Sequence, residues 1–537
     1  MVHTVTAANR LADILPVFDS DPRVQVVYTC PWASAVTNGV EQHLAAIGAL
    51  VMPWEQVVAT EFDLALSVHN SGNLHDINAP LIILSHGMGY TKYSPGNRET
   101  GKPGNRETGK PGNRSVYGLS REWLVHDDAV VPSAIVLSHD EQHARLAVAV
   151  PEALDSALIA GDPCLDRMIV SEPGRHRYRH ALGADDDTTI VLVTSTWGPD
   201  SLLGRNPDLI AQLLAELPTD RYTVVAALHP NTWFGHGPAQ IRLWLGDCLR
   251  AGLRLVPPAE GWQQAVLASD VAIGDHGAVT AYAAAVQRAV LLASFPGHQV
   301  AAGSAVEALG RAARRLDLLS PFAAQLDAAV GAAAEFTEVR ELASSLPGQS
   351  AGRLRNLFYE LMGLPEPGRA PLVAPYAPTA LVPDQSQVEA WWVTADWCEQ
   401  EVAVARWPAD VDARPEHPPN NHDRHLVVHH RHPRRDLYGN AAIVLLDHPD
   451  EAEAVFADRP ACTLAVAGAR VMHRDGGIAS IALPETAKTA ESAFIACASA
   501  IRTWLSDGRT WQSLPKSITV RLGARPVQAT ITVHSGQ

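Results

Sequence analysis

Two short apolar runs flank an alanine-rich segment in ASDVAIGDHGAVTAYAAAVQRAVLLASF, residues 268–295. The runs at 271–275 and 289–295 have the length of buried strands, and the segment at 277–287 has the length of a helix. Apolar runs without polar alternation are typical of parallel strands that are covered on both faces. These residues therefore predict one strand–helix–strand unit of a parallel sheet.

The same alternation continues on the N-terminal side of this unit. Strands are expected at 188–195, 222–230 and 253–258, and helices at 208–217, 238–251 and 260–270. Asn206 and Pro207 supply an N-cap and a first-turn proline for the first of these helices. Short loops join the elements, which is typical of a doubly wound sheet. Residues 174–364 are therefore predicted to form a Rossmann-like domain.

Residues 1–173 carry a second series of apolar runs. Strands are expected at 24–29, 62–68, 81–87, 134–139 and 156–163, and a helix at 40–50. The predicted fold class is therefore α/β, with two Rossmann-like, doubly wound domains in one chain.

An eight-residue repeat interrupts the first of these domains. GNRETGKP occupies 96–103 and again 104–111, and GNR restarts at 112. Its glycine and proline content predicts a loop over 96–114. A slipped duplication in an exposed loop is the favoured interpretation. The alternative is a basic flap that closes over an anionic substrate, formed by Arg98, Lys102, Arg106, Lys110 and Arg114.

The C-terminal third begins after a proline-rich linker at 365–384. A helix is expected just before it at 351–362, with Ser350 as its cap. Residues 385–537 are predicted to form a smaller α/β or α+β domain. Its strands are expected at 441–446, 463–466, 518–522 and 529–533, and its helix at 487–505. This domain has no assigned role, and a protein partner is one possibility for it.

The composition narrows the class of protein. The chain has 537 residues and a formal net charge of −16, which argues against a nucleic-acid partner. No run of about 18 apolar residues is present, so no integral membrane segment is expected. The N-terminus does not resemble a secretion signal. The 6 cysteines are scattered without CxxC spacing. A cytoplasmic protein without cofactor or metal is therefore expected.

Histidines gather in one stretch of the C-terminal domain. A metal site and a solvated loop are both consistent with them, and the loop is favoured because no ligand spacing is matched. The stretch contains His417, His422, His425, His429, His430 and His432.

The candidate ligand site lies in loops that follow strands of the second predicted domain. Ligands of open parallel sheets bind at the carboxyl ends of the strands. One of these loops opens a helix, whose free backbone N–H groups suit a phosphate. Capping of that helix by Asp275 is the alternative. The predicted donor-binding residues are Thr194, Ser195, Thr196, Asp275, His276, Gly277, Ala278, Val279 and Thr280.

Four short motifs resemble those of CDP-glycerol glycerophosphotransferases, which have a GT-B fold. They are SHGMG at 85–89, AGDPCLDRM at 160–168, LHP at 228–230, and the strand and loop within 268–295. In the last motif, His276 and Gly277 replace the family's Tyr-Ser pair, and Ala278 replaces a second serine. The resemblance covers roughly residues 24–300.

The resemblance implies roles for particular residues. His86 would be the general base that removes a proton from an acceptor hydroxyl. A protonated His229 would stabilise charge on the leaving nucleotide. Residues 277–280 would hold the pyrophosphate, and the scheme needs no metal. The implied partners are a nucleotide-activated donor and a hydroxyl-bearing acceptor.

Three functions follow from these observations. The leading prediction is a transferase that moves a glycerophosphate-like or glycosyl group from the donor to the acceptor. The second is a catalytically degenerate GT-B module that binds a nucleotide or a protein partner, which the replaced serines favour. The third is a nucleotide-sugar epimerase or hydrolase on the same fold, for which no cleft carboxylates are evident.

Overall fold

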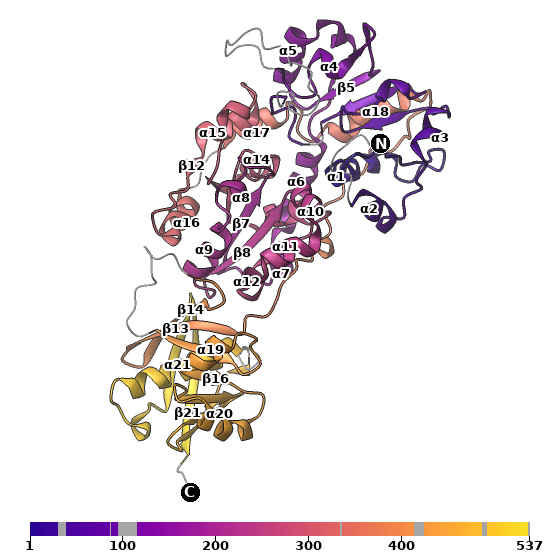
Figure 1. Ribbon diagram of the computed structural model, residues 1–537. Helices are drawn as coiled ribbons and strands as arrows, with labels where there is room; N and C mark the ends of the chain where they lie inside the picture. Colours follow the sequence, from indigo (N-terminus) through magenta and orange to yellow (C-terminus); the bar gives the residue numbers. More distant parts are fainter. Residues whose placement is uncertain are drawn as a thin grey trace.

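The computed structural model describes residues 1–30, 39–85, 87–94, 115–332, 336–412, 424–485 and 491–534. Within these ranges, two parallel sheets and one closed barrel follow one another along the chain. They lie in a row, with the first sheet and the barrel at opposite ends (Figure 1). The expected α/β class is confirmed for the two sheets, whose strands are all parallel and alternate with helices.

The second sheet has the strand order β12-β11-β10-β7-β8-β9. Counted from β7 along the chain, this is the doubly wound order 3-2-1-4-5-6, in which the direction of winding reverses between β7 and β10. The strands are β7 (Thr189–Ser195), β8 (Tyr222–Leu228), β9 (Arg254–Val256), β10 (Val271–Gly274), β11 (Ala289–Leu292) and β12 (Arg314–Arg315).

Helices cover both faces of this sheet, which explains why the central strands β7, β8 and β10 carry apolar residues at successive positions. In β7, Ile190 and Leu192 pack on one face while Val191 and Val193 pack on the other. The first face is covered by α13 (Trp262–Ala268), α14 (Ala278–Ala285), α15 (Ala305–Ala312) and α17 (Thr337–Ala343). The second face is covered by α9 (Leu209–Glu216), α10 (Pro230–His236), α11 (Pro238–Trp244), α12 (Gly246–Arg250) and α16 (Phe322–Gly331).

The first sheet differs from the expected doubly wound arrangement. Its strands β1 (Ala65–Ser67), β2 (Leu81–Leu84), β5 (Ala134–Leu137) and β6 (Ala157–Ile159) lie side by side in chain order, without a reversal. The expected strand at 24–29 is wrong, because only an isolated bridge between Tyr28 and Val51 forms there. Helices α4 (Arg121–Leu124) and α5 (Asp140–Ala149) cover one face.

The other face of the first sheet is covered by helices from both ends of the α/β region. They are α1 (Val5–Ile14), α2 (Val40–Ala46) and α18 (Ser350–Leu361). Leu354 and Phe358 of α18 share a core with Ile82 and Leu84 of β2, although α18 follows the whole second sheet in sequence. The expected helix at 351–362 is confirmed, but Gln349 rather than Ser350 is its N-cap.

The C-terminal domain is a closed barrel, a closure that the sequence pattern did not predict. Its strand order is β13-β14-β20-β21-β19-β18-β17-β16-β15. The strands are β13 (Ala390–Cys398), β14 (Glu401–Pro408), β15 (His425–His429), β16 (Ile443–Leu445), β17 (Leu464–Ala467), β18 (Arg470–His473), β19 (Ile478–Ala482), β20 (Ser517–Leu522) and β21 (Arg525–His534). Helix α21 (Glu491–Ser506) shares their apolar core.

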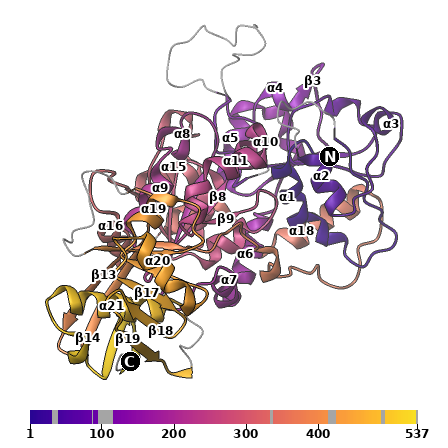
Figure 2. The same ribbon diagram turned by 60° about the horizontal axis from the view of Figure 1, so that its bottom comes forward.

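The barrel docks on the amino-terminal ends of the second sheet's strands (Figure 2). The Arg406 guanidinium pairs with Asp220 just before β8, with Nη2 2.6 Å from Oδ1. Nearby, the Trp407 ring N–H donates to the carbonyl of Glu216 at 3.2 Å. The barrel and the carboxyl ends of these strands therefore lie at opposite edges of the sheet.

Among the described helices, none has the length and apolar content that a membrane crossing requires.

Candidate functional site

The reversal between β7 and β10 is organised by one buried carboxylate. Asp275 directly follows β10 and is 0% exposed. Its Oδ2 accepts from the backbone N–H groups of Thr196 at 2.9 Å and Leu202 at 2.8 Å, and its Oδ1 accepts from Gly277 N–H at 2.9 Å. Burial raises the pKa of Asp275, while these three hydrogen bonds and the charge of Lys92 act in the opposite direction. Asp275 therefore fixes the loops after both strands relative to each other.

Helix α14 begins at this point without a side-chain cap. Gly277 is the N-cap residue, and Asp275 bonds the N–H of Gly277 itself rather than an N–H inside the first turn. Ala278 and Val279 are both partly exposed. The first turn of an uncapped helix presents N–H groups and a positive dipole end to any neighbouring ligand.

The hydroxyl groups that were expected to reach a ligand are buried in the loops. Thr280 is 0% exposed, and its Oγ1 accepts from the N–H of Asp275 at 3.2 Å. The Ser195 hydroxyl donates to the carbonyl of Thr196 at 2.9 Å and accepts from the N–H of Leu203. Thr194 is 2% exposed. These side chains therefore support the backbone of the loops.

His229 lies at the carboxyl end of β8 as the N-cap of α10. Its Nδ1 accepts from the N–H of Asn231 at 3.0 Å, so the ring hydrogen is on Nε2. Burial, together with the charge of Lys92, lowers the pKa of His229 to about 3. The resemblance implies a protonated His229 beside the leaving nucleotide, whereas without a ligand the burial of the imidazole beside an ammonium group favours its neutral form. A neutral His229 still donates a hydrogen bond from Nε2.

His276 lies in the turn between β10 and α14 and is 3% exposed. Burial and the nearby charge of Lys92 lower its pKa to about 3. Its Nδ1 is buried and has no hydrogen-bond partner among the described residues. A second neutral imidazole therefore lies at the reversal point.

Lys92 is a site residue that the sequence motifs missed. It belongs to the first domain, and the segment around it pairs with the second domain. The N–H of Tyr93 donates to the carbonyl of Gln299 at 3.0 Å, and the N–H of Ala301 donates to the carbonyl of Thr91 at 2.9 Å. Burial lowers the pKa of Lys92, an effect that the Asp275 carboxylate opposes. Lys92 makes no ion pair with any described residue, and its charge acts on His229, His276 and Asp275.

The His-Gly motif of the first domain meets the start of α14. A Cβ added to Gly87 would lie 3.3 Å from the Cβ of Ala278, so the two loops touch. The Ser85 hydroxyl donates to the carbonyl of Gly89 at 2.6 Å and shapes the turn. His86, the expected base, lies outside the described residues, as does the repeat loop at 96–114.

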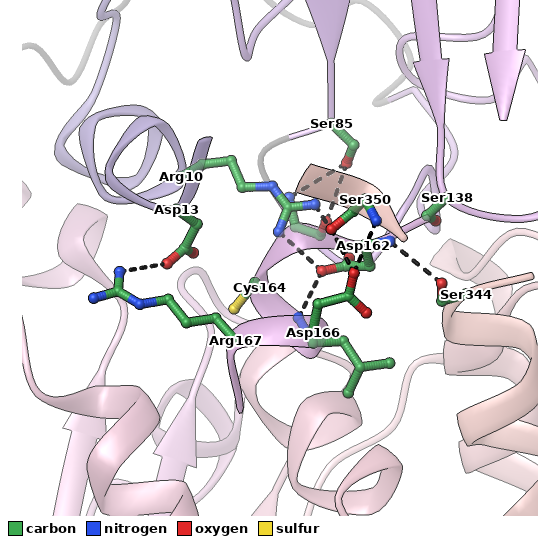
Figure 3. A network of polar contacts seen from close by, with 12 residues as sticks. Arg10, Asp13, Ser85, Ser138, Asp162, Cys164, Asp166, Arg167, Ser344 and Ser350 are labelled. Carbon is green, nitrogen blue, oxygen red and sulfur yellow. Dashed lines mark hydrogen bonds and ion pairs between the residues drawn. The ribbon is translucent and has the colours of Figure 1, made fainter. Parts of the chain in front are cut away.

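A buried polar network joins α1 to the residues around the start of α6 (Figure 3), and Tyr282 of α14 extends it to the second domain. The Arg10 guanidinium of α1 makes two 3.1 Å contacts with the carboxylate of Asp162, and the Tyr282 hydroxyl of α14 donates to Asp162 at 2.8 Å. Asp162 also caps α6 (Pro163–Ser171) by accepting from the N–H of Leu165. All of these side chains are buried. They hold α14 of the second domain against α1 and α6 of the first.

Asp166, the aspartate of the AGDPCLDRM motif, has a structural role in the same network (Figure 3). Its carboxylate accepts from the N–H groups of Gly348 at 2.6 Å and Ser350 at 3.0 Å, and from the Ser350 hydroxyl at 2.5 Å. Gly161, in the same motif, has φ +88°, and a Cβ there would lie 2.8 Å from the carbonyl oxygen of Leu346. The motif therefore joins α6 to the start of α18.

No protein-family model and no curated protein matches this chain. Among solved structures, it is similar to the wall teichoic acid polymerase TagF, with 13% identity over 65% of this chain and 83% of that chain, and a TM-score of 0.42. It is also similar to MnaA of S. aureus with UDP, at 12% identity, 69% and 98% coverage and a TM-score of 0.38. HepE of Anabaena in complex with UDP has 13% identity, 66% and 96% coverage and a TM-score of 0.36.

Proposed function

We propose that this chain transfers a glycerophosphate-like or glycosyl group from a nucleotide-activated donor to a hydroxyl acceptor. One observation carries the proposal. An uncapped helix start, an ammonium group without an ion-pair partner among the described residues, and two neutral imidazoles converge where the winding of the second sheet reverses. This is the position at which open α/β sheets bind nucleotides.

The donor diphosphate binds at the start of α14. The N–H groups of Ala278 and Val279 and the ammonium of Lys92 supply positive potential to the phosphate oxygens. His229 donates from Nε2 to an oxygen of the leaving nucleotide, and this interaction strengthens as negative charge develops there. Anion binding raises the pKa of His229 from its low unliganded value, because a negative charge favours the imidazolium.

The acceptor approaches from the first domain. Its hydroxyl oxygen attacks the phosphorus or anomeric carbon of the donor, its proton passes to a base, and the nucleotide leaves with the electrons of the broken bond. We assign the base to His86 from the motif resemblance. The contact between Gly87 and Ala278 supports this assignment, because it brings the two loops together.

Lys92→Met is expected to weaken binding of the preferred nucleotide about 10- to 100-fold, because a hydrogen bond to a charged group contributes about 1.5–3 kcal/mol. The measurement is a thermal-shift titration of the full chain with CDP, UDP, GDP and ADP and their glycerol or sugar conjugates. Lys516→Met is the matched control, since Lys516 is exposed on the barrel. Equal affinities in the two variants, or no stabilisation by any nucleotide, would contradict the donor site.

A nucleotide-binding module without turnover is the second candidate. Asp275 favours it, because its carboxylate occupies the Gly277 N–H and places negative charge near the start of α14. The two functions are separated by incubating the bound donor with glycerol- and sugar-type acceptors. Release of free nucleotide that depends on the acceptor supports the transferase, whereas binding without release supports the module.

A further inference from the structure

Three metal-binding side chains meet at one edge of the barrel. His429 ends β15, His430 follows it, and Asp447 lies two residues beyond the end of the neighbouring parallel strand β16. The Nε2 atoms of His429 and His430 lie 3.7 Å and 2.9 Å from the two carboxylate oxygens of Asp447. The side chains of His429 and His430 are 12% and 22% exposed, and that of Asp447 is 33% exposed, so the cluster lies at the surface with its two imidazoles partly buried.

The other described histidines of this stretch have different partners. His425 contacts the hydroxyl of Ser499 at 2.9 Å inside the barrel. His432 contacts the carboxylate of Asp410 at 3.2 Å, and both of these side chains are buried. Only the pair at 429 and 430 therefore turns toward Asp447, while His417 and His422 lie outside the described residues.

We propose that His429, His430 and Asp447 bind a divalent transition-metal ion of the Zn²⁺ type. Zn²⁺ in proteins takes imidazole nitrogen and carboxylate oxygen at about 2.0–2.2 Å, which places neighbouring tetrahedral ligands roughly 3.3 Å apart. One ligand atom from each of the three residues lies within 4.8 Å of the others, so small side-chain rotations close the site. Three protein ligands at a solvent-accessible edge leave the fourth position for water or another ligand.

The Glu451 carboxylate lies beside the ring nitrogen of His430 that faces away from Asp447. Its Oε2 is buried without a hydrogen-bond partner among the described residues and lies 3.8 Å from Nδ1 of His430. A histidine that binds metal through one ring nitrogen commonly donates from the other to a carboxylate, which fixes the ring. Metal coordination by Nε2 of His430 gives Glu451 this partner.

Arg431 opposes metal binding. Its guanidinium lies 2.8 Å from Oδ1 of Asp447, and its backbone N–H donates to Nδ1 of His429 at 3.3 Å. The Arg431 side chain is 62% exposed, so it can move into solvent when the metal binds. When Nε2 of His429 binds the metal, the hydrogen of the ring moves to Nδ1. Nδ1 then no longer accepts from the backbone N–H of Arg431. The site lies in the barrel, and the proposal does not depend on the donor site.

Isothermal titration with ZnCl₂ tests the site in the full-length, tag-free chain after treatment with a chelator. Asp447→Asn and His430→Gln are each expected to lower Zn²⁺ affinity at least about tenfold. Arg431→Gln is expected to raise it, because the competing cation is gone. Asp475→Asn is the matched control, since Asp475 forms a comparable pair with His473 on the same barrel, 3.7 Å apart.

The outcomes of this titration are distinct. Loss of binding in the two ligand variants, with wild-type affinity in Asp475→Asn, supports the site, provided that circular dichroism shows all variants folded. The absence of a saturable Zn²⁺ site in the wild type overturns the proposal. Equal affinity in Asp447→Asn and Asp475→Asn also overturns it. Nucleotide binding is unaffected in every one of these cases if the proposed donor site is right.

Discussion

Asp162→Ala is expected to lower the free energy of unfolding by about 3–5 kcal/mol, the usual cost of leaving one buried charge of an ion pair without its partner. Arg10 is 7% exposed, and Asp162 supplies both of its 3.1 Å carboxylate contacts. The Tyr282 hydroxyl, which donates to Asp162 at 2.8 Å, also loses its acceptor. The loss is measured by urea unfolding followed by circular dichroism, using the transition of the α/β region.

The double variant Arg10→Met, Asp162→Leu is the control for Asp162→Ala. It removes both charges and fills the space with apolar side chains, which is often neutral or stabilising at buried ion pairs. Recovery of most of the lost stability in the double variant shows that the cost in Asp162→Ala comes from the isolated guanidinium. A loss below about 1 kcal/mol in Asp162→Ala would mean that the network does not hold α1, α6 and α14 together.

Acidification from pH 7 to pH 5 is expected to destabilise the protein by about 2 kcal/mol for each histidine that is neutral in the fold and has a strongly lowered pKa. Burial lowers the pKa of His229 and of His276 from the usual 6.5 to about 3. Burial also lowers that of His69 to about 4. The unfolded chain therefore binds these protons first. Their contribution to stability is complete above pH 6.5 and is lost progressively as the pH falls toward the folded-state values.

His276→Gln tests this pH dependence at the candidate site. The free energy of unfolding in urea is measured at pH 7 and at pH 5 for the wild type and for the variant. The decrease from pH 7 to pH 5 is expected to be smaller in the variant by about 2 kcal/mol. The comparison between two pH values cancels the effect of the substitution on packing, because that effect is present at both. Identical losses in the two proteins would show that His276 carries no proton-linked stability.

Strand and helix positions in the second sheet were predictable because strands that are buried on both faces need apolar residues at successive positions, which is a local property of the sequence. Residues 190–193, 224–228 and 271–273 are unbroken apolar runs, and they form the centres of β7, β8 and β10. The barrel was harder to predict, because strands such as β14 are buried on one side only. In that strand Val402 and Val404 are buried while Ala403 is exposed, an alternation that is weak among short side chains.

The candidate site was predictable in its loops but not in its polar groups. The positions of His229, His276 and the α14 start follow from the strand ends, because parallel strands place their carboxyl ends at one edge. The neutral state of His229 depends on burial and on the charge of Lys92, neither of which is a property of neighbouring residues. Lys92 reaches the site only because its backbone pairs with residues near 300.

The sequence by itself determined the α/β class, the series of strands in the second sheet and the loops at their ends, because these depend on the periodicity of apolar residues over a few positions. Only the tertiary structure decided the return of α18 to the first sheet, the closure of the barrel, and the pairing of Arg10 with Asp162. These arise from contacts between segments that are far apart in the chain. The free energies of these contacts depend on which surfaces are buried together, and a short stretch of sequence does not specify its distant partner.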